Sequence, residues 1–136
     1  VLELKAHQTK EKEAEAVAKI VEMVEKYGLT DRTEYISFSL FACKEFKRVA
    51  PQGTDIYYLN GELSPAELKT LGFAGFDYSM GPIKKHPEWI EEAHKLGLKV
   101  NVWTIDKEAD MQWLIDQKVD FITTNEPVLL QQLLRK

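Results

Sequence analysis

The sequence of 136 residues is poor in cysteine and histidine and has no long apolar run. Its one cysteine, Cys43, excludes a disulfide within the chain and a zinc site built from cysteines. No run approaches the roughly 20 apolar residues that a membrane-spanning helix needs. Basic residues number 18 against 22 acidic ones, so the net charge of -4 gives no electrostatic reason to expect nucleic acid as a partner.

Short runs rich in apolar, β-branched and aromatic residues alternate with longer segments of helical periodicity. The runs that predict strands are residues 1–5, 34–39, 54–59, 72–78, 99–105 and 119–123. Between them, Thr9 and Ser64 are placed to cap helices, and Gly28 and Gly97 to end them. Strict alternation of strand and helix is typical of βα units around a parallel sheet. No linker or low-complexity tract divides the chain, which predicts one domain over residues 1–136.

Two α/β architectures fit this order of elements, a closed (βα) barrel and an open doubly wound sheet. A doubly wound sheet generally has a glycine-rich phosphate loop after its first strand, whereas residues 3–13 read ELKAHQTKEKE. A complete barrel has eight βα units in roughly 200 residues or more. Since the chain starts with a predicted strand and no Met, we expect a partial TIM-type (βα) barrel with about six of its eight units.

The first predicted strand, VLELK, has two charged side chains on one face. Glu3 and Lys5 share this face, and Leu2 and Leu4 share the other, because strand side chains alternate. If the leucines pack under the helices, the charged pair points into the barrel, where it needs hydrogen-bond partners or a metal ion. The alternative is an edge strand with its polar side in solvent. Barrel active sites lie at the carboxyl ends of strands, so the pair is a candidate site.

Other side chains are predicted around the same mouth because they end later strands. They are Ser37, Phe38, Asn60, Tyr78, Trp103, Thr104 and residues 123–126. A core tryptophan is the alternative interpretation of Trp103. His86 and His94 fall on a predicted helix and are expected at the surface, whereas His7 is a candidate neighbour of the site. Cys43 is predicted to be a small core residue, since no histidine is placed to activate it.

The most specific pattern is GLKVNVWTIDKEADMQWLIDQKVDFITTNEP, near the end of the chain. This segment resembles the closing portion of glycerophosphodiester phosphodiesterases. The matching residues are Val100, Val102, Trp103, Thr104 and Asp106, followed by Val119, Asp120, Ile122, Thr123 and Pro127. The segments VLELK, YISF and GFAGFDY resemble the third, fourth and sixth barrel strands of the same family. The resemblance therefore covers the whole chain, which would be the C-terminal portion of the catalytic barrel.

The resemblance implies a metal-dependent hydrolase that converts glycerophosphodiesters to glycerol 3-phosphate and an alcohol. It implies that Glu3 is a ligand of Ca²⁺ or Mg²⁺, that Lys5 approaches the substrate phosphate, and that Trp103 lines the glycerol side of the pocket. Hard cations prefer carboxylate oxygens, and phosphodiester cleavage needs positive charge near the reacting oxygens. The family's two catalytic histidines belong to motifs that this chain lacks. The chain alone is therefore expected to be inactive, and no catalytic residue is assigned.

Two alternatives from other classes stay open at this point. One is a Schiff-base aldolase, with Lys5 as the amine and Glu3 tuning its protonation. The other is a noncatalytic binding module derived from the barrel. Whatever the function, the first and last strands of a partial barrel would be open edges. We therefore expect a homo-oligomer or a missing N-terminal segment that completes the barrel. Asn125 stands where many relatives have Asp, and this difference is expected to alter local hydrogen bonding.

Overall fold

The computed structural model describes residues 1–135, which form one parallel sheet of six strands in the order of the sequence. The strands are β1 (Leu2–Leu4), β2 (Tyr35–Ser37), β3 (Ile56–Tyr58), β4 (Gly75–Ser79), β5 (Lys99–Trp103) and β6 (Phe121–Ile122). The register pairs Leu2 with Tyr35, Tyr35 with Ile56 and Gly75 with Lys99. All six predicted strands are confirmed, and each is shorter than predicted.

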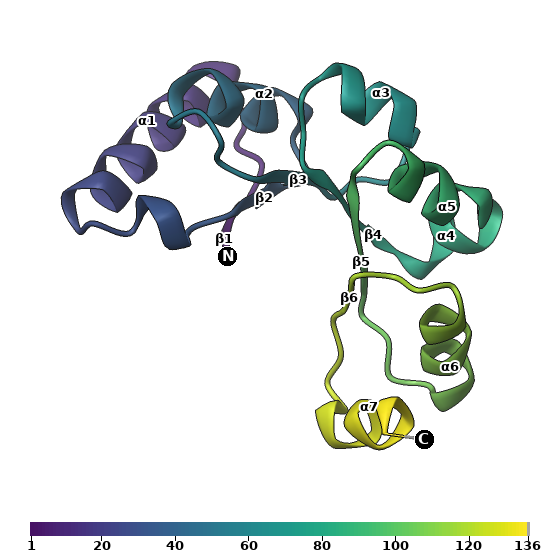
Figure 1. Ribbon diagram of the computed structural model, residues 1–136. Helices are drawn as coiled ribbons and strands as arrows, with labels where there is room; N and C mark the ends of the chain where they lie inside the picture. The colour runs from purple at the N-terminus through teal and green to yellow at the C-terminus, as the bar shows by residue number, and fades with distance from the viewer. Residues whose placement is uncertain (136) are drawn as a thin grey trace.

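The helices all lie on one side of the sheet, as Figure 1 shows. They are α1 (Lys10–Lys26), α2 (Leu40–Val49), α3 (Pro65–Thr70), α4 (Met80–Lys85), α5 (Glu88–Lys95), α6 (Glu108–Asp116) and α7 (Pro127–Leu134), with a 3-10 helix at Thr30–Arg32. The strands follow an arc, and the helices cover its outer, convex side (Figure 1). A curved parallel sheet with helices on its outer side is the arrangement of a partial (βα) barrel. None of the helices within residues 1–135 could cross a membrane.

The predicted helix boundaries are formed by local hydrogen bonds. The hydroxyl groups of Thr9 and Ser64 each accept a hydrogen bond from the backbone N–H three residues later. Gly28 and Gly97 follow α1 and α5 with φ angles of 67° and 77°, a left-handed conformation that glycine adopts without strain. These residues stop each helix where the chain must turn back toward the sheet.

Helix α4 was not predicted, because its sequence MGPIKK contains a glycine and a proline. Pro82 lies in the first turn of this helix, where a backbone N–H has no partner within the helix. The proline is therefore tolerated at this position.

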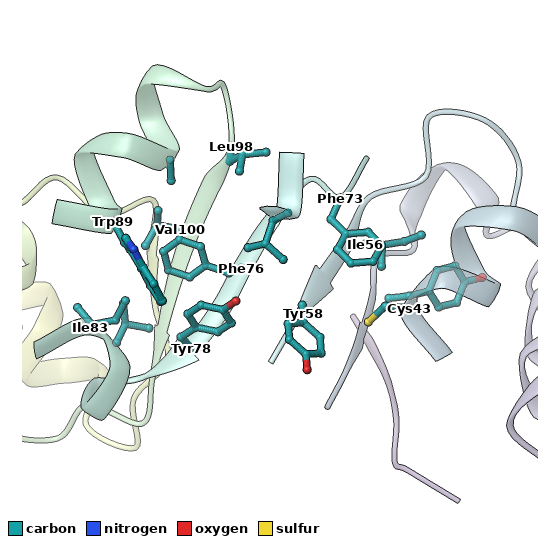
Figure 2. Packing of buried hydrophobic residues seen from close by; sticks show 14 of the residues in the cluster. Cys43, Ile56, Tyr58, Phe73, Phe76, Tyr78, Ile83, Trp89, Leu98 and Val100 are labelled. Atoms are coloured by element: carbon teal, nitrogen blue, oxygen red, sulfur yellow. The ribbon is translucent and has the colours of Figure 1, made fainter. Parts of the chain in front are cut away.

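The convex face of the sheet carries the hydrophobic core. Phe76, Tyr78, Val100 and Val102 are fully buried there, and Figure 2 shows the first three packed beside Trp89. The Phe76 and Tyr78 rings stack with centroids 4.4 Å apart. The prediction that Tyr78 faces the mouth is wrong. Its hydroxyl instead donates a hydrogen bond to the carbonyl of Leu63, over a distance of 2.8 Å.

Cys43 is part of the same core, as predicted. The side chain is fully buried, and its sulfur lies 3.7 Å from the Ser37 carbonyl oxygen. Burial raises the pKa of the Cys43 thiol to about 12. A thiol this hard to ionise is a poor nucleophile at neutral pH.

Candidate functional site

A cavity of about 650 Å³ occupies the concave face of the sheet. Its wall includes Glu3 of β1, Asp77 of β4, Asn101 and Trp103 of β5, and Phe38, which follows β2. Residues far apart in the sequence therefore meet at one hollow. The two predicted site residues Glu3 and Trp103 both lie on its wall.

The orientation of β1 agrees with the expected alternation. Leu4 is buried under the helices, whereas Glu3 lines the cavity. Lys5 comes directly after the strand and is exposed, and the alternation places it on the same side as Glu3. Lys5 is not among the residues that line the cavity, so its approach to a substrate phosphate stays a prediction.

A hydrogen-bonded network holds this end of β1. The Ser37 hydroxyl donates to the Leu4 carbonyl at 2.6 Å and accepts from the Ser39 N–H at 3.0 Å. The Ser39 hydroxyl donates to a carboxylate oxygen of Glu13, and the His7 N–H donates to the other at 3.4 Å. Glu13 is buried. Its position four residues before Val17, on the apolar stripe of α1, was the signal that the sequence prediction missed.

The three histidines lie outside the cavity wall. His7 is exposed, with its ring Nδ1 2.8 Å from the Lys5 carbonyl oxygen. His86, which follows α4, stacks on Trp89 of α5, and the Nε2 of His94 on α5 lies 2.9 Å from an Asp120 carboxylate oxygen. His7 is therefore near the predicted site, and the other two belong to the outer surface.

Trp103 and Phe38 form an aromatic wall at the mouth of the cavity. Their rings meet edge to face, with centroids 5.8 Å apart. The indole N–H of Trp103 donates a hydrogen bond of 2.8 Å to the backbone carbonyl of Asp77. This bond and the aromatic contact fix the ring orientation. Trp103 is partly exposed, so it is not a core tryptophan.

Asp77 is the residue of this cavity that the sequence analysis did not identify. Its side chain is only 7% exposed, and its Oδ1 has no hydrogen-bond partner among residues 1–135. Burial raises the pKa of Asp77 to about 6 despite a hydrogen bond from Asn101, and the negative charge of Glu3 raises it further. The available signal was a charged residue between two buried aromatics, Phe76 and Tyr78.

The cavity offers part of a site for a hard cation. The carboxylate of Glu3 lines the cavity, and the unpartnered Oδ1 of Asp77 belongs to the same wall. Carboxylate oxygens are the ligands that Ca²⁺ and Mg²⁺ prefer. Within the described part of the chain, however, no three side chains gather as a metal-binding group. The role of Glu3 as one ligand of a larger set therefore stays a prediction.

A second network joins the loops that follow β5 and β6. Asp106 Oδ1 accepts hydrogen bonds from the Asn125 N–H at 2.8 Å and from the Thr124 hydroxyl at 3.1 Å. Asp106 Oδ2 accepts from the Asn125 side-chain amide at 3.2 Å. These bonds hold the pKa of Asp106 below its usual value. As predicted, Asn125 takes part in the local hydrogen bonding, here as a donor that an aspartate could not replace.

Comparisons with known proteins agree on one family. The model of the glycerophosphoryl diester phosphodiesterase family matches residues 2–129. A glycerophosphodiester phosphodiesterase of Caldanaerobacter subterraneus is 30% identical over 121 residues, which is 87% of this chain and 49% of that protein. The chain thus spans about half the length of this curated relative.

Solved structures give the same result. The crystal structure of a glycerophosphodiester phosphodiesterase from Parabacteroides distasonis is 47% identical and superposes with a TM-score of 0.94, over 98% of this chain and 56% of that one. An Oleispira antarctica phosphodiesterase, crystallised with its product sn-glycerol-3-phosphate, is 21% identical with a TM-score of 0.75, over 99% of this chain and 55% of that one. The latter supports the fold alone.

Proposed function

The chain belongs to the glycerophosphoryl diester phosphodiesterase family, and from this premise we propose that it forms part of a metal-dependent active site that cleaves glycerophosphodiesters to glycerol 3-phosphate and an alcohol. The observation that carries the proposal is the position of Glu3 and Trp103 on one cavity at the concave face. The family match, and the 47% identical glycerophosphodiester phosphodiesterase from Parabacteroides distasonis, support the choice of substrate class. The family match favours this function over a Schiff-base aldolase that uses Lys5.

Each predicted residue has a chemical role in this proposal. Glu3 would hold a divalent cation, Ca²⁺ or Mg²⁺, which when bound polarises the phosphate. Lys5 would place a positive charge beside phosphate oxygens that become more negative during cleavage. Trp103, together with Phe38, would supply an apolar surface for the carbon chain of the glycerol group.

Proton transfer is not among the roles that we assign to residues 1–135. The wall of the cavity contains no histidine from this part of the chain. General acid and base groups each contribute roughly a hundredfold or more to such reactions. We therefore expect the 136-residue chain by itself to bind ligands without hydrolysing them, and a binding measurement is the appropriate test.

The test is a titration of the chain with glycerol 3-phosphate in the presence of Ca²⁺ or Mg²⁺, in which calorimetry measures the binding. Lys5→Met should weaken phosphate binding about tenfold or more, because hydrogen bonds to charged groups contribute roughly 1.5–3 kcal/mol. Glu3→Gln should remove the dependence of binding on the cation. Lys99→Met is the matched control, since Lys99 is an exposed lysine at the opposite end of a strand. Equal affinities for Lys5→Met and Lys99→Met would contradict the proposed role of Lys5.

We further propose that the edges of the sheet pair with another strand, from a second copy or from another part of a complete barrel. Strands β1 and β6 form the two edges. Both bear exposed apolar side chains, with Leu2 42% and Phe121 50% exposed. Open edges with apolar side chains favour association. Light scattering of the purified chain should therefore give a mass above that of one copy, and a monomer at all concentrations would argue against self-association.

A further inference from the structure

The buried carboxyl group of Asp77 is not explained by the fold. Its Oδ1 has no hydrogen-bond partner among the described residues, although the side chain is more than nine-tenths buried. An unpaired buried polar group costs free energy that a folded protein normally avoids. The core does not require this side chain, because Phe76 and Tyr78 on either side of it pack on the opposite face of β4.

The surroundings of Asp77 indicate the chemistry of its partner. Asn101 lies close enough to lower the pKa of this carboxyl group, and the Asn101 Oδ1 accepts a hydrogen bond from the Thr123 hydroxyl at 3.2 Å. The backbone carbonyl of Asp77 holds the indole of Trp103. An unpartnered acceptor and an aromatic wall therefore line the same cavity. A ligand that fits must donate a hydrogen bond and also offer an apolar surface.

Phosphate and a cation fit this position less well than a hydroxyl group. A phosphate has no proton to donate in its dianionic form, so it cannot pair with the acceptor of Asp77, and the negative charge of an ionised Asp77 would repel it. A cation would satisfy Oδ1, but no third ligating side chain gathers there within residues 1–135. A hydroxyl group on a short carbon chain can donate to Asp77 while its C–H groups contact Trp103.

We propose that Asp77, whose backbone carbonyl accepts the indole N–H of Trp103, binds a free hydroxyl group of the glycerol portion of the substrate. This inference rests on the proposed function and adds a specificity residue to it. The phosphate would lie toward Glu3 and Lys5 on β1, and the hydroxyl-bearing carbons toward β4 and β5. The cavity would then select polyol phosphates over alkyl phosphates, because a ligand without the hydroxyl leaves the buried acceptor unpaired.

The experiment compares glycerol 3-phosphate with n-propyl phosphate, which has the same phosphate and carbon chain but no hydroxyl group. Calorimetry and the NMR signal of the Trp103 indole N–H measure the binding of each compound to the 136-residue chain. The signal is assigned to Trp103 by its loss in Trp103→Phe. We expect glycerol 3-phosphate to bind about ten- to hundredfold more tightly. Asp77→Leu, which replaces the acceptor by a larger apolar side chain, should abolish this preference and leave the affinity for n-propyl phosphate unchanged or higher.

Asp77→Asn is the second variant, and it keeps an oxygen acceptor without the charge. It should retain a reduced preference, and it guards against misfolding of the leucine variant. Equal binding of the two phosphates to the unmodified chain would overturn the role of Asp77 and leave the proposed function intact. A preference that survives in Asp77→Leu would do the same. If neither phosphate binds, the proposed function fails and this inference fails with it.

A cation at Asp77 is tested with the same variants. Titration with Ca²⁺ alone should give the same affinity for the unmodified chain and for Asp77→Leu, whereas Glu3→Gln should weaken it. Loss of Ca²⁺ binding in Asp77→Leu would overturn the assignment of Asp77 to a hydroxyl group.

Discussion

The two faces of the same sheet differ in how completely their polar and apolar groups are paired. On the convex face, Phe76 and Val100 are fully buried, and the Tyr78 hydroxyl has a hydrogen-bond partner. On the concave face, Asp77 Oδ1 and the Tyr57 hydroxyl are buried without partners among residues 1–135. Both faces are made from alternate residues of the same strands. The convex face therefore accounts for stability, and the concave face retains unsatisfied groups that a ligand or another strand can pair.

One strand can contribute both to the stability of the convex face and to binding at the concave face. In β4, Phe76 and Tyr78 alternate with Asp77, so a change of one residue along the strand changes the face. Substitutions on the convex face should therefore affect folding, whereas substitutions on the concave face should affect binding and can even stabilise the chain. Three measurements test this division.

The largest effect is expected for a pair of phenylalanine substitutions. Phe76→Ala removes a fully buried ring from the convex face and should lower the free energy of unfolding by about 3–5 kcal/mol. Phe121→Ala removes a ring of β6 that is 50% exposed on the cavity wall, and it should cost less than about 1 kcal/mol. Urea denaturation of both variants gives the comparison.

Phe76→Leu replaces Phe76→Ala if the alanine variant does not fold. It should still be less stable than Phe121→Leu. Similar losses from both leucine substitutions would mean that the concave face is as much a part of the core as the convex one.

The second effect has the opposite sign, because neutralising Asp77 should stabilise the fold. The pKa of Asp77 is about 6 in the folded chain, against roughly 3.9 when unfolded. Well below the unfolded pKa, at about pH 3 and lower, both states hold the proton. As the pH rises toward 6, the unfolded chain releases it first, so stability falls by on the order of 2 kcal/mol and stays lower above that range. Asp77→Asn should remove this loss and be the more stable protein at pH 7.

Asp120 supplies a matched control for the Asp77 measurement. Its carboxylate accepts a hydrogen bond of 2.7 Å from the Val100 N–H and lies beside His94. Asp120→Asn should therefore destabilise the chain at pH 7. Urea denaturation at pH 4 and pH 7 distinguishes the two cases, and a loss of stability at pH 7 in both variants would show that Asp77 has a partner in solution.

The sequence predicted the convex face better than the concave one. Strand positions, helix caps and the burial of Cys43 follow from periodicity and local hydrogen bonding, which act over a few residues. The position of Glu3 and Trp103 on the wall of one cavity could also be predicted, from the alternation of side chains in β1 and from the family pattern around Trp103. The prediction for Tyr78 was wrong because the alternation of side chains along β4 was not applied to it. This alternation places Tyr78 on the same face as Phe76.

The remaining features depend on contacts between distant elements. Asp77 becomes notable in the folded sheet, where burial is the main cause of its raised pKa and the charge of Glu3 adds to it. Glu13 acquires its role from Ser39, which lies 26 residues away. Such pairings depend on sheet curvature and on the relative position of α1 and β2. Periodicity along the chain contains no information about either.

The smallest effect is expected at the rim, where the two faces meet. Asn125→Asp would replace an amide that donates to Asp106 by a second carboxylate. The resulting repulsion should lower the melting temperature slightly at low salt, and high salt should reduce the loss because the groups are exposed. Asn125→Ala removes the bond without adding charge, so the order of stability at low salt should be Asn, Ala, Asp.

The hydrogen bonds lower the pKa of Asp106, and their contribution is present above the usual pKa of Asp and is lost as the pH falls through the lowered value. The three proteins should therefore converge in acid, and an aspartate variant more stable than the alanine variant at neutral pH and low salt would show that the rim does not depend on this network.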